Sequence, residues 1–124
     1  MKSMSARDLV QSYYDSLNRK DGKWQELYSD DAVFSDASQT LHAKGKAAVI
    51  QSFIPFLKGV EGAKVRQMII EGGDVCAVVG YNYVNPKGGK MSQDVAEVWE
   101  VKGGKLAKLT IYFDLIAYRN FMRG

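Results

Sequence analysis

The spacing of the hydrophobic positions changes about halfway along the chain. In the first half they recur every three or four residues, as on helices that bury one face. From Val65 onward they form longer apolar runs separated by segments that contain glycine, as in strands joined by tight turns. Helices followed by strands, rather than an alternation of the two, predict an α+β domain.

Three helices are predicted in the first half. The first begins near Ser5, whose hydroxyl can cap it, and Asp8 suits its positive N-terminal end. A short second helix follows the break at 18–22. The third follows Gly45 and should end or kink at Pro55, because proline lacks the N–H that a helix needs. The apolar stripe of the first helix consists of Leu9, Val10, Tyr13, Tyr14 and Leu17.

The strands are predicted to form an antiparallel meander after one short strand at 33–36. Paired glycines at all three turns supply the positive φ that tight hairpins require. The meander strands are expected at 65–70, 75–84, 91–101 and 106–115, with turns at 71–74, 85–89 and 102–105.

The composition fits one globular domain that spans residues 1–124. Hydrophobic residues make up 46% of the chain and charged residues 25%, which suffices for one sizeable core. The net charge of +3 comes from scattered lysines rather than from a concentrated patch, so we expect no nucleic-acid partner. We also expect a cytoplasmic protein without membrane contact. The chain has a single cysteine, no apolar signal core at its N-terminus and no run of ~20 apolar residues.

The strands are apolar on both faces. One face must pack on the helices, and an open apolar sheet face on a monomer would favour aggregation. We therefore expect a homodimer through the open sheet face. The alternative is a monomer that short edge strands and lysines protect.

Several stretches, in their order along the chain, resemble the nuclear transport factor 2 superfamily, which includes ketosteroid isomerase and the SnoaL-type polyketide cyclases. The resemblance implies three N-terminal helices packed on a curved, mainly antiparallel sheet, a cystatin-like cone with a central pocket. The stretches that carry it are 10–18, 27–36, 44–50, 96–101 and 104–114.

Three positions resemble the catalytic pattern of ketosteroid isomerase. The resemblance implies that Asp36 is a base, and that Tyr13 and Glu97 donate hydrogen bonds to an enolate. Such a mechanism needs no cofactor. The family has aspartate where Glu97 stands, and a hairpin of different length would put Ala96 there instead.

Each of the three also has a structural interpretation. Asp36 could cap a turn, and Tyr13 could be a packed aromatic residue of the core. Glu97 shares its strand face with Val95, Trp99 and Val101, where burial would favour the neutral acid; otherwise it is exposed at a sheet edge or pairs with a cation. Asp94 is expected on the opposite face.

The resemblance also implies a pocket for a small apolar ligand. His42, the only histidine, could serve as a base or a hydrogen-bond partner there, or be an ordinary surface residue. No metal site is expected, because the chain has no clustered histidine and cysteine. The expected lining consists of Trp24, His42, Phe53, Val79, Trp99, Leu109, Ile111 and Phe113.

Three functions are compatible with these residues. The first is an isomerase or cyclase that transfers a proton next to a carbonyl on an apolar, ring-containing substrate. The second is a binder of a small apolar ligand without catalysis, and the third is a protein-interaction module with a filled pocket. Epoxide hydrolysis is disfavoured because Ile111 stands where that branch has an aspartate.

Overall fold

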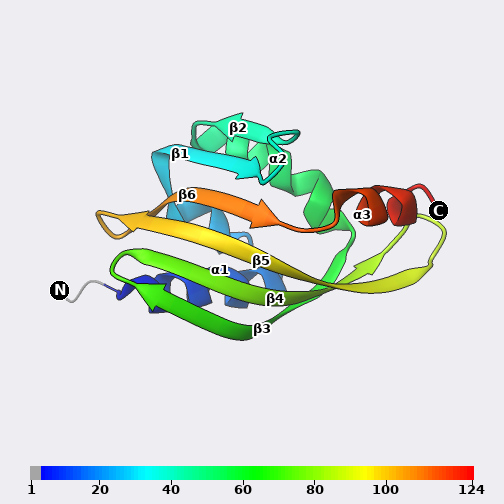
Figure 1. The fold of residues 1–124 in the computed structure, drawn as a ribbon, viewed down its shortest axis with the longest axis horizontal. Helices are drawn as coiled ribbons and strands as arrows, with labels where there is room; N and C mark the ends of the chain where they lie inside the picture. The colour runs from blue at the N-terminus through cyan, green and yellow to red at the C-terminus, as the bar shows by residue number, and fades with distance from the viewer. Residues whose placement is uncertain (1–3) are drawn as a thin grey trace.

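In the computed structural model, which describes residues 4–124, the helices α1 and α2 pack on one face of a six-stranded sheet (Figure 1). A third helix, α3, lies at one end of the sheet beside the C-terminus. The elements are α1 (Ala6–Arg19), the 3-10 helix η1 (Lys23–Leu27), β1 (Tyr28–Asp36), β2 (His42–Lys44), α2 (Lys46–Lys58), β3 (Val60–Glu71), β4 (Asp74–Val84), β5 (Lys90–Lys102), β6 (Lys105–Tyr112) and α3 (Leu115–Met122).

The sheet is mixed but mainly antiparallel, as expected. Its strands follow the order β2-β1-β6-β5-β4-β3, and β1 runs parallel to β6 while all other neighbours are antiparallel. The predicted meander is therefore confirmed from β3 to β6, with its turns at 72–73, 85–89 and 103–104. The α+β class is confirmed as well.

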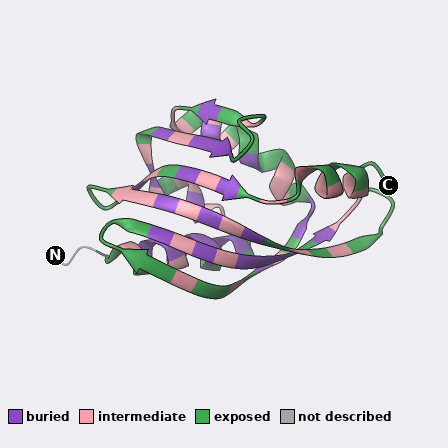
Figure 2. Ribbon diagram, in the orientation of Figure 1, coloured by how far each residue is buried: buried purple, intermediate pink, exposed green. Residues whose placement is uncertain are grey.

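Along most of β4 and β5, buried residues alternate with more accessible ones (Figure 2), so the two strands have a buried inner face and a more accessible outer face. Val79 lies on the inner face of β4, and Val95, Glu97 and Trp99 lie on that of β5. The predicted face of Glu97 is confirmed. Asp94 is on the outer face, where it forms an ion pair with Arg66 at 2.9 Å.

Helix α1 begins as its sequence predicts. Ser5 accepts a hydrogen bond from the backbone N–H of Asp8, and the five stripe residues of this helix are buried. Both Tyr13 and Tyr14 therefore face the sheet, although they are adjacent in sequence. The helix brings their hydroxyl groups close to residues of β1, β4 and β5.

The prediction that all three helices lie in the first half of the chain is not confirmed. The short second helix is a 3-10 helix of five residues, and the third α-helix of the structure, α3, lies at the C-terminus. The last strand ends at Tyr112 because Asp114 caps α3 by accepting from the N–H of Ala117. The strand β2 was not predicted, and β1 begins earlier, at Tyr28.

Helix α2 also continues through Pro55 to Lys58. The turn after the proline carries Phe56, whose ring packs edge-on against Tyr81 and Tyr83, with centroids 5.4 and 5.9 Å apart. We attribute the continuation of the helix to this aromatic packing. It matters for the site because Pro55 and Phe56 face a cavity between α2 and the sheet.

The junction between β2 and α2 depends on Gly45, whose φ of 93° and ψ of 145° strongly disfavour any residue with a side chain. We expect Gly45→Ala to lower the free energy of unfolding by about 1–3 kcal/mol in urea titrations. Gly62→Ala is the matched control, because a Cβ there would meet no atom closer than 3.8 Å. Equal losses in the two variants would contradict this account of the junction.

Candidate active site

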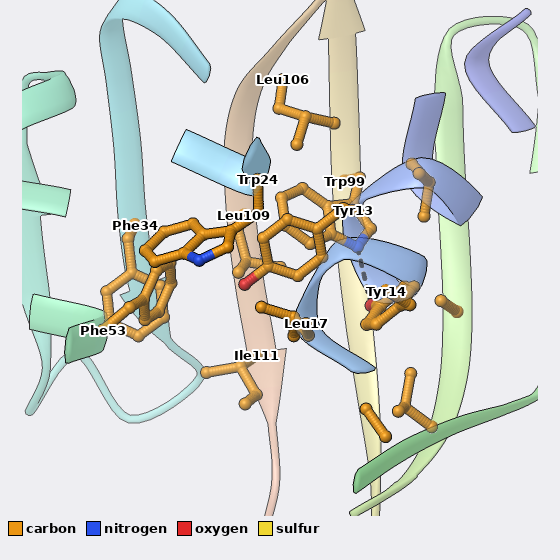
Figure 3. Packing of buried hydrophobic residues seen from close by; sticks show 14 of the residues in the cluster. Tyr13, Tyr14, Leu17, Trp24, Phe34, Phe53, Trp99, Leu106, Leu109 and Ile111 are labelled. Atoms are coloured by element: carbon orange, nitrogen blue, oxygen red, sulfur yellow. Dashed lines mark hydrogen bonds between the residues drawn. The ribbon is translucent and has the colours of Figure 1, made fainter. Parts of the chain in front are cut away.

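A cavity of about 480 Å³ lies between α2, α3 and the inner face of the sheet. Its lining is largely aromatic and apolar, and Phe34 and Phe53 form one wall with ring centroids 4.7 Å apart (Figure 3). A second groove of about 540 Å³ lies between α1 and β3, but its lining is mostly polar and holds no buried ionisable group. The first cavity is therefore the better candidate for chemistry. It is lined by Tyr13, Phe34, Thr40, Leu41, His42, Ser52, Phe53, Pro55, Phe56, Tyr81, Glu97, Ile111, Phe113, Leu115, Tyr118 and Arg119.

Glu97 is the buried ionisable group of this cavity, with an exposed fraction of 3%. Its Oε1 accepts hydrogen bonds from the hydroxyl groups of Tyr14, at 2.6 Å, and Tyr81, at 2.8 Å. The Tyr14 oxygen in turn accepts from Trp99 Nε1 at 3.0 Å, the dashed line in Figure 3. These contacts join α1, β4 and β5 in one polar network inside an apolar core.

The second oxygen of Glu97 is in a different position. Oε2 makes no hydrogen bond to the part of the chain that the structure describes, whereas Oε1 already has two donors. Because Glu97 also lines the cavity, Oε2 is the atom available to a ligand. In the neutral acid it can carry the proton, and in the carboxylate it can accept one.

Burial raises the pKa of Glu97 from 4.5 to about 7, although the hydrogen bonds from Tyr14 and Tyr81 oppose this effect. Burial and then the charge of Glu97 raise the pKa of both tyrosines well above 10. Both tyrosines therefore remain protonated donors while Glu97 titrates. No ion pair involves Glu97 among residues 4–124.

Tyr13 lines the cavity next to this network. Its ring packs edge-on against Tyr14, Trp24 and Trp99, and burial raises its pKa above the ordinary value of 10. Its hydroxyl is therefore a hydrogen-bond donor rather than an anion. Of the two adjacent tyrosines, Tyr14 binds Glu97 and Tyr13 reaches the cavity.

The structure does not bring Asp36 into the lining with Tyr13 and Glu97. Asp36 pairs with Ile111 across β1 and β6 and is buried, but its carboxyl oxygens accept hydrogen bonds from the Ser38 hydroxyl and the Leu41 N–H. Burial alone would raise the pKa of Asp36, yet these hydrogen bonds outweigh it and lower the pKa. The carboxylate thus holds the turn between β1 and β2, the capping role weighed above.

The expected lining residues divide into two groups. Those that line the cavity are His42, Phe53, Ile111 and Phe113. The others are fully or nearly fully buried in the adjoining core without being part of the lining: Trp24, Val79, Trp99 and Leu109.

Sequence reasoning missed Tyr81 and the three residues of α3 that line the cavity: Leu115, Tyr118 and Arg119. Tyr81 could have been found, because it lies two residues from Val79 on the inner face of β4. For α3, the available signal was Asp114 as a helix cap.

Two features are absent from residues 4–124. No cluster of three or more histidine, cysteine, aspartate or glutamate side chains is arranged to hold a metal ion there. In the same residues, no helix has the length and apolar character that crossing a membrane requires.

Comparisons with known proteins agree with the fold. A sequence profile of the SnoaL-like domain matches residues 10–109, while comparison with curated proteins finds no match. Similar solved structures include a candidate isomerase from Bacillus subtilis, at 18% identity and a TM-score of 0.81, covering 96% of this chain and 93% of that chain.

Two others are an NTF2-like protein of unknown function from Burkholderia pseudomallei and a candidate SnoaL-like polyketide cyclase from a Jannaschia species. The first has 14% identity and a TM-score of 0.84, covering 98% of this chain and all of that chain. The second has 14% identity and a TM-score of 0.82, covering 97% of this chain and 92% of that chain. At these identities the structures show a shared fold alone, whereas the profile match spans most of the sequence. The chain belongs to the SnoaL-like domain family, within the nuclear transport factor 2-like superfamily.

Proposed function

We propose that this protein is a small-molecule isomerase or cyclase that transfers a proton next to a carbonyl group. The observation that supports this most strongly is the position of Glu97. One of its oxygens is held by two tyrosine hydroxyls and the other is free at the wall of an apolar cavity. A general base works best when its pKa is near the operating pH, and burial brings Glu97 to about 7.

In this mechanism, Glu97 Oε2 removes a proton from the carbon next to the carbonyl, and the electron pair of the C–H bond moves to form an enolate. The Tyr13 hydroxyl, which lines the same cavity, is the donor that we assign to the enolate oxygen. Where a carbon–carbon double bond of the substrate is conjugated with the enolate, the protonated Glu97 returns the proton to the far carbon of that bond, and the double bond moves next to the carbonyl, which gives an isomer. In a cyclase, the enolate carbon instead attacks a second carbonyl carbon of the same molecule, the π electrons of that C=O bond move to its oxygen, and the protonated Glu97 gives its proton to this oxygen.

This assignment moves the base from Asp36 to Glu97. The Asp36 carboxylate is engaged by Ser38 and Leu41, and its lowered pKa makes it a weaker base. The apolar lining supports a ring-containing substrate. Binding of such a ligand without catalysis is the alternative, whereas an interaction module with a filled pocket has less support because about 480 Å³ is open.

Proton transfer can be tested without knowing the natural substrate, by following hydrogen–deuterium exchange at the α-carbon of 2-tetralone in D₂O by NMR. We expect the protein to accelerate exchange and Glu97→Gln to lose about 10²-fold or more of that acceleration. The exchange rate with Asp36→Asn should be within about threefold of the rate with the unmodified protein, provided that the variant is folded. Glu97→Gln keeps the shape of the side chain and its hydrogen bonding.

Other outcomes would change the assignment. A larger loss in Asp36→Asn than in Glu97→Gln would return the role of base to Asp36. Binding of the ketone without any acceleration of exchange would favour a non-catalytic binder.

We also propose that the outer face of the sheet forms a homodimer. Val78, Ala96 and Val98 are partly exposed there, and Ile69 and Tyr112 are 56% and 50% exposed. The paired registers place Ile69, Val78 and Val98 on the same face. Such a patch is typical of an interaction surface.

Sedimentation at micromolar concentration should give about twice the chain mass of 13.8 kDa. Val98→Lys should shift the protein to the monomer, because it would place a charge at the centre of this face. Ala47→Lys, on the exposed side of α2, is the matched control and should leave the dimer intact. A monomeric unmodified protein would refute the dimer.

A further inference from the structure

Helix α3 contributes a positive charge to the rim of the cavity. Leu115, Tyr118 and Arg119 all line the cavity, and their spacing of three and four residues places them on one face of the helix. Asp114 fixes the start of this helix by accepting from the Ala117 N–H. Arg119 is exposed and yet part of the lining, so its side chain lies where the cavity meets solvent.

The Arg119 guanidinium has no acidic partner among the described residues. The four ion pairs there join other side chains, and no hydrogen bond from the Arg119 side chain is formed within residues 4–124. The nearest acidic residue in sequence, Asp114, is occupied as the helix cap. The five N–H donors of the guanidinium are therefore available to a ligand.

The remaining polar groups of the lining set the charge of the cavity. Thr40, His42 and Ser52 offer hydrogen bonds near the exposed end. Glu97 is the only carboxyl group in the lining, and it lies at the buried end. The cavity is thus apolar in the middle, with a cation at the rim and a proton-transfer group inside.

We propose that the ligand of this cavity is a ring-containing carboxylic acid whose carboxylate binds Arg119. Its ring body would lie against Phe34, Phe53 and Ile111, and its reactive carbon would face Glu97. The planar guanidinium matches the two oxygens of a carboxylate and orients the ligand as well as attracting it. This inference rests on the proposed small-molecule function and names its substrate class.

Arg119 also has a structural interpretation. It lies in the last turn of α3, where a cation interacts favourably with the helix dipole. That role would change the stability of the helix but would not distinguish a charged ligand from a neutral one. The test therefore compares two ligands of nearly equal shape.

The probes are 2-naphthoate and 2-naphthamide, and binding is followed by tryptophan fluorescence or calorimetry at about pH 6, where Glu97 is largely protonated. We expect the unmodified protein to bind the carboxylate about five- to tenfold more tightly than the amide, with a preference that weakens as salt is added. Arg119→Gln should bind both equally, while Arg119→Lys keeps part of the preference. Arg123→Gln, at the end of the same helix but outside the lining, is the matched control and should keep all of it.

Two results would overturn the inference: an unchanged preference in Arg119→Gln, or no binding of either probe to the unmodified protein. Both results are measurements of binding and do not depend on catalysis, so they can be told apart from a failure of the exchange experiment. The two proposals can also separate. If Glu97→Gln loses exchange while Arg119→Gln keeps the preference for 2-naphthoate, proton transfer by Glu97 is supported and carboxylate binding by Arg119 is rejected.

Discussion

One buried carboxyl group constrains how the helices and the sheet fit together. Glu97 lies on the inner face of β5, where an isolated charge would be costly. Tyr14 from α1 and Tyr81 from β4 offset that cost by donating to the same oxygen. Rotating α1 by one residue, or shifting β4 against β5, would leave Glu97 without one of its donors. The carboxyl group therefore favours one packing arrangement over its neighbours.

The same group links stability to pH. The pKa of Glu97 in the folded protein, about 7, is above its ordinary value of 4.5, so the folded state binds this proton more tightly than the unfolded chain. The resulting stabilisation is complete below about pH 4.5 and is lost as the pH rises through about 7. The carboxyl group that we propose as the base thus lowers the stability of the fold near neutral pH.

Much of the fold could be predicted because its signals are local. The alternation along β4 and β5, the glycines at the turns and the Ser5 cap each act within a few residues. The site was less predictable, because Tyr14 and Glu97 are 83 residues apart in sequence. Tyr13 and Tyr14 both belong to the buried stripe, and only the packing of α1 decides which hydroxyl meets the carboxyl. Similarly, Asp36 lies on the buried face of its strand, as a pocket residue would, but its carboxyl oxygens accept hydrogen bonds from the turn that follows it.

The titration of the Glu97 carboxyl by ¹³C NMR, with its signal assigned by its loss in Glu97→Gln, measures directly whether burial raises the pKa of this group. We expect a midpoint near pH 7. Tyr14→Phe should raise this midpoint, because it removes a hydrogen bond that stabilises the anion. Tyr83→Phe, whose hydroxyl donates to Gln93 instead, should change it much less. A midpoint near the ordinary 4.5 in the unmodified protein, or no change in Tyr14→Phe, would show that burial and the hydrogen bond from Tyr14 do not set the pKa of Glu97.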